Sequence, residues 1–468
     1  MTQAPAVEES LPLKEQFRLL LSASKGFWLV NVVNFGDGIA YFGILNLLTL
    51  FLGLQGLGMS DQVTGWSVSA FTGLVTLFMI GGGTVSDRLG VRRALTLCLV
   101  LLLAGRLMLV GSASLPQSAG FGLAWLGLFI YAFGEGVIQP ALYAGAKEYT
   151  DKRTATMSYS LLYAIMNLGI VVESFFSPYV RTDKTFLSLG KASMTGLGLG
   201  IGGVFWVCIG ITALMLLSQA GLFTAAVERR DRAEDATPAA GPAMTFMESL
   251  KGLPLLDGRF MFFIFILLPV RTLFAHQWLT LPDYIMRCYP PEVGAKYEWI
   301  SGLNPLIIVV FVPLIAAMTQ RVSVVAMMIA GTALSALTTF ILVPGPDLTA
   351  LIAYVLLFSL GEAMWSSRFL EYVADIAPAG RVGAYMGLAG IPWFLAKFTT
   401  GLYSGSMLNR FVPLGGPHDT GTLWLIYGLI ACLSPVGLIL ARGWLSGHKD
   451  SLLAARSSTG ARTPSSSS

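Results

Sequence analysis

Ionisable side chains inside long apolar stretches are the residues of this sequence best placed to do chemistry. In the first half of the chain these are Asp37, Glu135, Glu173 and Arg106, which makes three acids for one base. A charge at the centre of a lipid bilayer costs about 2.5–3.5 kcal/mol, so each needs a partner, water or a function. We interpret Asp37 and Glu135 as a protonatable pair or a pair that awaits a cation. The structural alternative is that Arg106 neutralises one acid while the other reaches water.

The second half carries a more balanced set of such residues, namely Arg271, His276, Glu362, Arg368, Glu371 and Lys397. Arg368 and Glu371 are three residues apart, so we predict that they pair on one helix. Glu362, Ser366 and Phe369 fall at i, i+4 and i+7, hence on one helical face. If Lys397 pairs with Glu362, a bound ligand has to compete with it.

His276 stands in an apolar stretch beside Gln277. An imidazole titrates near neutral pH, which makes a proton switch one interpretation. The alternative is a neutral hydrogen-bonding residue in a cavity wall. Several aromatic residues are candidates for lining a pocket, although packing or an interfacial belt is the alternative for each; they are Tyr41, Phe42, Trp278, Trp365 and Trp393.

The composition indicates the elements that position these residues. Of the 468 residues, 54% are hydrophobic and only 12% are charged, against about 25% charged in soluble proteins. Mean hydropathy is +0.70, and the 52 glycines suit closely packed membrane helices. These values exclude a disordered chain, a nucleic-acid binder and a disulfide scaffold. The sequence therefore predicts an all-α membrane protein with several spans.

Apolar segments of about 20 residues, the length that crosses about 30 Å of hydrocarbon, recur along the chain. We predict twelve spans, at 27–52, 62–83, 94–112, 120–145, 156–180, 196–224, 260–286, 299–319, 322–343, 350–376, 383–406 and 421–441. With a cytoplasmic N-terminus, 20 Lys and Arg residues lie on the inner side and 6 on the outer side. This asymmetry predicts that both termini are cytoplasmic.

The spans group into two halves. We expect an N-terminal tail (1–26), a six-helix bundle (27–227), a cytoplasmic linker (228–259), a second six-helix bundle (260–441) and a disordered tail (442–468). The linker is rich in mixed charge, Ala and Pro, and the last residues are rich in Ser. Two such halves are the layout of transporters whose substrate binds at the midplane.

One loop is a motif in its own right. Between the second and third spans the sequence places Gly83, Asp87, Arg88, Gly90, Arg92 and Arg93 in the pattern G-x-x-x-D-R-x-G-x-R-R. This resembles the signature loop of the major facilitator superfamily. A basic turn needed only for orientation would not explain the two glycines and the aspartate at these offsets, so we expect a structural or gating role.

Four further stretches, in chain order, resemble the motifs of the proton-dependent oligopeptide transporters. They are residues 34–43 (NFGDGIAYFG), 134–140 (GEGVIQP), 163–169 (YAIMNLG) and 361–366 (GEAMWS) followed by Glu371 and Ala377-Pro378. Residues 274–277 (FAHQ) are a weaker fifth. The resemblance implies that Glu362 binds the amino group of a peptide-like substrate and that Tyr41, Asn167, Gln277, Trp365 and Ser366 line the substrate site.

The departures from that family fall on its charged residues. Its first-span Glu, Glu and Arg are Asn34, Asp37 and Gly38 here, and its fourth-span Lys is Gln139. We therefore predict a divergent relative, with Asp37, Glu135, Glu173 and His276 as candidates for proton coupling. Arg106, Arg368, Glu371 and Lys397 are assigned structural or gating roles.

The main hypothesis is a secondary active transporter in the plasma (inner) membrane that takes up small peptides or peptide-like solutes with protons. The alternatives are an exporter of cationic or amphipathic compounds on the same fold, and a non-transporting membrane sensor. No enzyme signature is present in the sequence, so no catalytic residue, cofactor or metal site is expected. The expected partners are the substrate, protons and the bilayer, with no nucleic acid, and the protein is expected to be a monomer.

Overall fold

The computed structural model describes residues 22–53, 56–150, 155–189, 192–231, 256–319, 322–376, 389 and 391–445. Most of the predicted linker and of both predicted tails lies outside these residues. The described part consists of helices and one two-stranded antiparallel hairpin, and it divides into two compact units. Each unit is described by itself.

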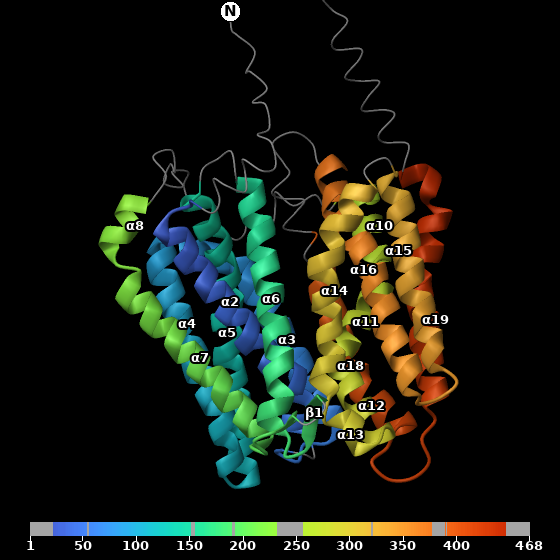
Figure 1. The fold of residues 1–468 in the computed structure, drawn as a ribbon. Coiled ribbons are helices and arrows are strands. Elements are labelled where there is room, and N and C mark those ends of the chain that lie inside the picture. Colours follow the sequence, from blue (N-terminus) through green and yellow to red (C-terminus); the bar gives the residue numbers. More distant parts are fainter. Residues whose placement is uncertain are drawn as a thin grey trace, which may run out of the picture. The chain divides into compact units, whose positions relative to one another are not determined.

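Unit 1 contains most of the first helices of the chain (Figure 1). They are α2 (Lys25–Leu52), α3 (Asp61–Leu89) from residue 70 onward, α4 (Val91–Gly111), the 3-10 turn η1 (Ser112–Ser114), α5 (Gln117–Glu148), α6 (Ala155–Arg181), α7 (Gly200–Leu222) and α8 (Ala225–Asp231). The unit also includes β1 (Thr185–Leu189), β2 (Ala192–Thr195) and residues 295–305, where α14 begins.

Unit 2 contains the helices that follow the predicted linker. They are α10 (Gly258–Ile266), α11 (Leu268–Leu279), α12 (Leu281–Cys288), α13 (Pro291–Gly294), α14 (Tyr297–Met318) from residue 306 onward, α15 (Val324–Thr338), η3 (Thr339–Leu342), α16 (Leu348–Ile376), α18 (Ile391–Phe411) and α19 (Thr420–Leu440). Residues 61–69, the start of α3, also belong to this unit.

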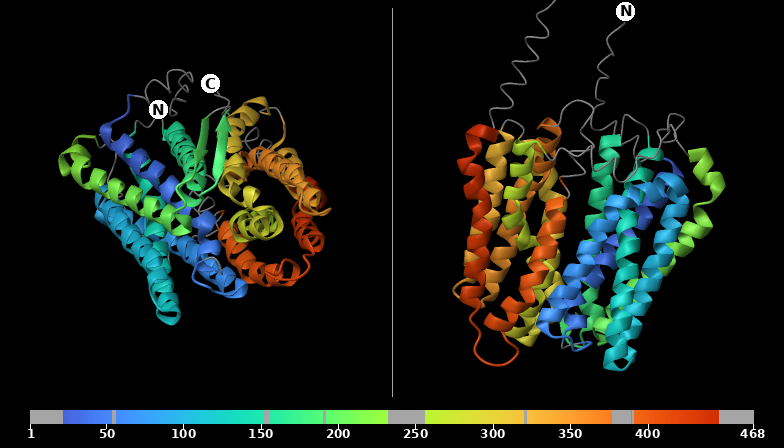
Figure 2. Two further views of the ribbon diagram at one scale, coloured as in Figure 1. Left: turned by 60° about the horizontal axis from the view of Figure 1, so that its bottom comes forward. Right: turned by 180° about the vertical axis from the view of Figure 1, so that it is seen from behind.

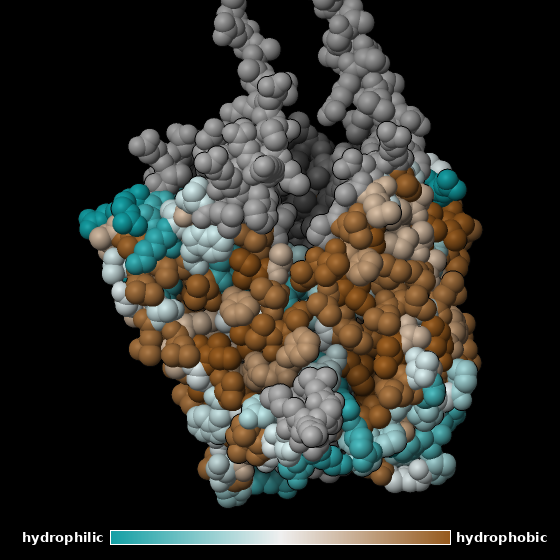
Figure 3. All heavy atoms as spheres, in the orientation of Figure 1, coloured by the Kyte–Doolittle hydropathy of each residue, from teal (hydrophilic) through white to brown (hydrophobic). Residues whose placement is uncertain are grey.

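Large apolar side chains cover the outside of many of these helices, as expected where a protein meets lipid rather than water. Leu217 on α7 is 68% exposed and Leu440 on α19 is 82% exposed. Figure 3 shows this apolar surface along the middle of the helices, with hydrophilic residues gathered at helix ends and over α8. The protein is therefore a multi-pass membrane protein.

Nine helices in the described part of the chain are long and apolar enough to cross a membrane. The helices α3, α14 and α18, which correspond to three more predicted spans, are not among these nine. The multi-pass helical architecture is confirmed, while the count of twelve spans stays a prediction.

Two local features differ from the sequence-based expectation. The expected outer loop before the sixth span holds the hairpin of β1 and β2, in which Thr185 lies opposite Thr195. The seventh predicted span is divided into α10, α11 and α12, with Leu267 and Thr280 between them. A proline near the start of α11 and of α12 explains the division, because proline lacks the N–H that a continuous helix needs.

Helix α2 forms the interior of unit 1, with α5, α6 and α7 packed against it (Figures 1 and 2). Its side chains are buried over nearly the whole length, including those of Asn34 and Asp37. Glycine allows the closest approach: a Cβ on Gly38 would lie 2.5 Å from the carbonyl oxygen of Met166, and one on Gly169 would lie 2.5 Å from that of Phe35. The pair α2–α6 is therefore held too closely for any side chain at these two positions.

Candidate functional site

A buried ionic cluster lies inside unit 1. The Arg106 Nη2 on α4 is 3.0 Å from Asp37 Oδ1 on α2 and 3.6 Å from Glu135 Oε2 on α5. The guanidinium carbon also lies 4.7 Å from the centre of the Tyr131 ring, and Nη1 donates a hydrogen bond to the Thr212 hydroxyl on α7. Four helices therefore meet at one arginine.

The charges of this cluster do not balance. Arg106 side-chain exposure is 0%, and that of both Asp37 and Glu135 is 3%. Two ionised carboxylates around one guanidinium leave one negative charge in a dry environment, where an uncompensated charge is costly. Binding one proton, or one cationic group, makes the cluster neutral. Arg106 is thus shared by Asp37 and Glu135 and does not neutralise one acid while the other reaches water.

Helix packing explains why the positive charge comes from α4 and not from α2. In the resembling family α2 carries an arginine where this chain has Gly38. No side chain fits there, because the backbone of Met166 on α6 occupies the space. The carboxylates of Asp37 and Glu135 are met instead by Arg106 of α4.

A second buried acid of unit 1 has only neutral donors among the described residues. Glu173 on α6 is 0% exposed, and its Oε2 accepts hydrogen bonds from the Asn46 amide at 3.3 Å and the Ser174 hydroxyl at 3.4 Å. One helical turn further on, Ser177 donates to Glu298, which also binds Arg181 through two bonds of 2.6 and 2.7 Å. Glu173 therefore lies beside an ion pair without sharing its arginine.

The two other predicted ligands of unit 1 are placed on the same helices. Tyr41, one turn beyond Asp37 on α2, packs its ring 6.3 Å from that of Tyr131 and is 8% exposed. Asn167 on α6 is 5% exposed and donates to the carbonyl of Tyr163 in its own helix. Tyr41 is therefore adjacent to the ionic cluster, whereas the amide of Asn167 is engaged by its own helix.

In unit 2, both ring nitrogens of His276 have hydroxyl partners. Nδ1 lies 2.7 Å from the Thr280 hydroxyl and Nε2 lies 3.1 Å from that of Tyr403, and the ring stacks on Tyr427 at 3.7 Å. The residue is 1% exposed. The neighbouring Gln277 donates to the Tyr354 hydroxyl at 3.1 Å. This geometry suits a neutral, hydrogen-bonded imidazole, and the proton switch stays a prediction.

On α16, Glu362 and Phe369 of the predicted face are 8% and 4% exposed and Ser366 is partly buried, while the neighbouring Trp365 is 1% exposed. Near these residues lies Arg271 of α11, an intramembrane charge for which the sequence predicts no particular role. Its guanidinium carbon is 4.3 Å from the Phe369 ring centre, 4.8 Å from that of Trp393 and 5.5 Å from that of Trp365.

The predicted pairing of Arg368 with Glu371 stays a prediction. Arg368 donates from Nη2 to the carbonyl oxygen and hydroxyl of Thr319, at 2.6 and 2.8 Å, and so ties α16 to the end of α14. The side chain of Glu371 lies outside the described residues. Lys397 places its Nζ 5.7 Å from the centre of the Trp278 ring.

Sequence reasoning also missed a compact ion-pair network in unit 2. Arg287 binds both carboxylate oxygens of Asp61 at 2.7 and 2.8 Å, Asp283 at 2.8 Å, and the carbonyl of Val412 at 2.9 Å. Burial alone would lower the pKa of Arg287, but the hydrogen bonds to Asp61 and the charge of Asp283 raise it above its ordinary value. Asp283 and Arg287 stand four residues apart on α12, a spacing visible in the sequence, whereas the contact of Arg287 with Asp61, 226 positions away, has no local signal.

The signature loop forms a tight connection between α3 and α4. Gly90 has a φ of 75°, a conformation that other residues adopt only with strain, which explains the glycine at this offset. Arg92 binds Glu228 of α8 at 2.8 Å, while Arg88 and Arg93 are exposed. The side chain of Asp87 lies outside the described residues, and the gating role of the loop stays a prediction.

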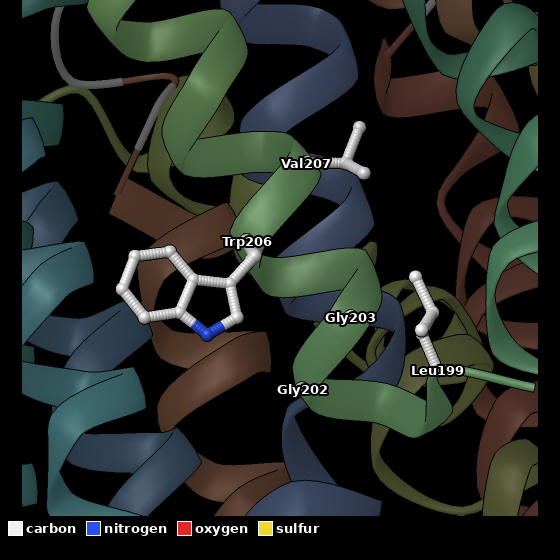
Figure 4. A pocket seen from close by; sticks show the side chains of 5 residues that line it. All are labelled: Leu199, Gly202, Gly203, Trp206 and Val207. Atoms are coloured by element: carbon white, nitrogen blue, oxygen red, sulfur yellow. The ribbon is translucent and has the colours of Figure 1, made fainter.

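An open hollow on the surface of α7 is separate from these groups. Leu199, Gly202, Gly203, Trp206 and Val207 line it, and Figure 4 shows Trp206 and Val207 pointing away from each other above the two glycines. Its lining is almost entirely apolar. We therefore place the candidate site at the buried ionisable groups of each unit.

Long apolar helices with ionisable groups buried inside helical units are typical of membrane transport proteins. The chain belongs to the Major Facilitator Superfamily, whose sequence profile matches residues 27–286, more than half of the chain. Dipeptide and tripeptide permease A of Yersinia pestis is 23% identical over 468 aligned positions, which cover 89% of this chain and 90% of the permease.

Solved structures give the same fold. A peptide transporter POT crystallised with sulfate aligns with a TM-score of 0.66 at 18% identity and covers 92% of this chain and 98% of its own. The nucleoside transporter NupG aligns with a TM-score of 0.68 at 14% identity, over 89% and 99%. The predicted resemblance to the proton-dependent oligopeptide transporters is confirmed, with this chain as a divergent relative. The fold alone accommodates more than one class of substrate.

Proposed function

We propose that the protein is a secondary active transporter that takes up small peptides or peptide-like solutes together with protons by alternating access. Twelve spans, two six-helix bundles (27–227 and 260–441), a plasma-membrane location and cytoplasmic termini belong to this proposal. The asymmetry of 20 inner against 6 outer Lys and Arg residues supports the orientation. Peptides are the proposed substrates because the matching relative from Yersinia pestis, aligned over nearly its whole length, is a dipeptide and tripeptide permease.

The observation that carries proton coupling is the arginine shared by two buried carboxylates. Asp37 and Glu135 lie within 3.6 Å of Arg106 and leave the cluster one positive charge short. A proton entering from the acidic side neutralises the cluster and favours its burial, whereas loss of the proton restores a charge that favours hydration. Such an element has two states that differ in free energy with pH, as coupling requires. Glu173, which is buried without a cationic partner among the described residues, is the second candidate.

Substrate recognition is assigned to unit 2. Glu362 on α16 supplies the negative charge for an amino group, and Trp365 and Ser366 follow on the same helical turn. In unit 1, Tyr41 lies beside the ionic cluster, so a substrate that contacts Tyr41 also acts on the cluster.

The experiment is uptake of labelled dipeptides and tripeptides into proteoliposomes with an imposed pH gradient. Wild-type protein is expected to accumulate peptide against its gradient, and D37N and E135Q are expected to lose accumulation while keeping peptide exchange without a gradient. E292Q removes an exposed acid of α13 and serves as the matched control. Failure of all peptides to accumulate or compete contradicts the substrate class, and extrusion of a fluorescent cation from loaded vesicles would favour the exporter.

A further inference from the structure

Arg271 presents an unusual combination of burial and missing partners. It is 1% exposed, and its Nε, Nη1 and Nη2 atoms are all buried without a hydrogen-bond acceptor in the described part of the chain. A guanidinium carries five N–H donors and stays protonated in proteins. Leaving all of them unsatisfied costs far more than leaving one neutral group, so such a residue needs a partner that the polypeptide does not provide.

Aromatic rings surround the guanidinium instead of acids. Phe369 and Trp365 of α16 and Trp393 of α18 form three walls, at 4.3, 5.5 and 4.8 Å from the guanidinium carbon to the ring centres. These contacts attract the cation, but they satisfy none of its in-plane N–H groups. No ion pair joins Arg271 to any acid of the described residues, including Glu362 on the same face of α16.

A second donor of the same cluster is also unsatisfied. The indole N–H of Trp365 is buried without an acceptor among the described residues, and the side chain is 1% exposed. Trp393, by contrast, is only partly buried, so the cluster is not sealed on that side by the residues described. The unsatisfied N–H groups of Arg271 and Trp365, next to the partly exposed Trp393, therefore define a place for a small, negatively charged hydrogen-bond acceptor.

We propose that Arg271, with the indole N–H of Trp365, forms an anion-binding site of unit 2 that holds the carboxylate of the substrate; this assignment rests on the proposed transport of peptides. A carboxylate matches the planar fork of a guanidinium and accepts its hydrogen bonds in pairs. Its charge neutralises the arginine, and the aromatic rings exclude water and strengthen the interaction.

The spacing along α16 adds a prediction about substrate length. The residues that contact Arg271 stand three and seven positions beyond Glu362, which is about 4.5–10.5 Å along a helix at 1.5 Å per residue. An extended chain spans about 3.3–3.6 Å per residue, so a dipeptide or tripeptide reaches about 7–11 Å. A free amino acid is too short to reach both Glu362 and Arg271.

The first test compares peptides with a free and an amidated C-terminus. Wild-type protein is expected to bind the free dipeptide about 10- to 100-fold more tightly than its amide, as expected for a charged hydrogen-bonded pair. R271Q is expected to lose this preference by weakening only the free peptide, R271K to retain part of it, and W365F to reduce it. R410Q, which removes an exposed arginine of the same unit beside the ring of Phe411, is the matched control.

The second test needs no peptide and separates binding from folding. We expect sodium benzoate, at matched ionic strength with sodium chloride, to raise the melting temperature of wild-type protein and R410Q but not that of R271Q. Without benzoate, R271Q is expected to melt no lower than wild type, because it removes an unpaired buried charge. A lower melting temperature with unchanged carboxylate preference would identify Arg271 as a structural cation and overturn the proposal.

The two proposals fail in different ways. If wild-type protein transports no peptide but benzoate still stabilises it through Arg271, the anion site stands and the peptide assignment falls. If peptides are transported and R271Q keeps the wild-type preference for the free carboxylate, the anion site falls and the transport function stands.

Discussion

Replacing Arg106 tests whether the buried cluster of unit 1 is organised by charge. In wild-type protein one guanidinium faces two carboxylates at 3.0 and 3.6 Å. R106Q leaves Asp37 and Glu135 buried together without a cation. D37N or E135Q, in contrast, makes the cluster formally neutral. We therefore expect R106Q to be the destabilised variant and the two acid variants to be as stable as wild type.

The magnitude follows from the burial of the three side chains. Removing one partner of a buried ion pair costs about 3–5 kcal/mol, and here two acids lose the same partner. We therefore expect R106Q to lose at least this much stability relative to wild type.

The assay is thermal unfolding of the purified protein in detergent. R106K preserves the charge and should recover part of the loss, and D37N/R106Q should be less destabilised than R106Q because only one acid remains in the cluster. A melting temperature of R106Q equal to that of wild type would refute the assignment of a charge-organised cluster.

Three further predictions concern helix packing and ion pairs. G38A should lower the stability by about 1–3 kcal/mol because a Cβ meets the Met166 carbonyl, whereas G210A on α7, with open space around it, should be neutral; thermal unfolding compares the two. R287Q should lower the folding stability by about 2–4 kcal/mol, since Asp61 and Asp283 are only 10% and 15% exposed and lose their shared partner. R287K should recover little of this loss, because a lysine cannot bind both oxygens of Asp61 in the way that an arginine does. Equal stability of R287Q and wild type would contradict this prediction. D231A should cost about 0.5–1 kcal/mol by removing the acceptor of the Gly26 N–H, which D231N retains. The hydrogen bond from Arg230 lowers the pKa of Asp231, so this contribution is present at neutral pH and is lost as pH falls below about 4; a pH-independent difference between D231A and wild type would contradict the assignment.

The sequence was sufficient for the features that depend on local pattern. Long apolar segments predicted most helix positions to within a few residues, for example 27–52 against Lys25–Leu52 and 421–441 against Thr420–Leu440. The division of the seventh predicted span was not expected, although its prolines were visible, because tertiary packing decides whether a proline kinks a membrane helix or separates two helices.

The sequence did not predict which residues the buried charged side chains contact. The acids Asp37 and Glu135 were recognised as in excess and Arg106 as the base that could neutralise one of them, but contact of Arg106 with both acids was not predictable, since the three residues lie on three helices. Arg368 binds Thr319, 49 positions away, a contact that no local spacing indicates. Local spacing identifies pairs that can meet, and only the packing of helices decides which pairs do.

The sequence by itself determined that this chain crosses a membrane many times, to which superfamily it belongs and which ionisable residues lie in apolar surroundings. Transfer of apolar side chains out of water depends on composition and period, which are local properties. The tertiary structure alone decided that Gly38 leaves no room for an arginine, that Arg106 replaces it from α4, and that Arg271 is enclosed by aromatic rings. Those outcomes depend on distances between helices, because charge and steric interactions act over a few ångströms and join residues that the sequence keeps far apart.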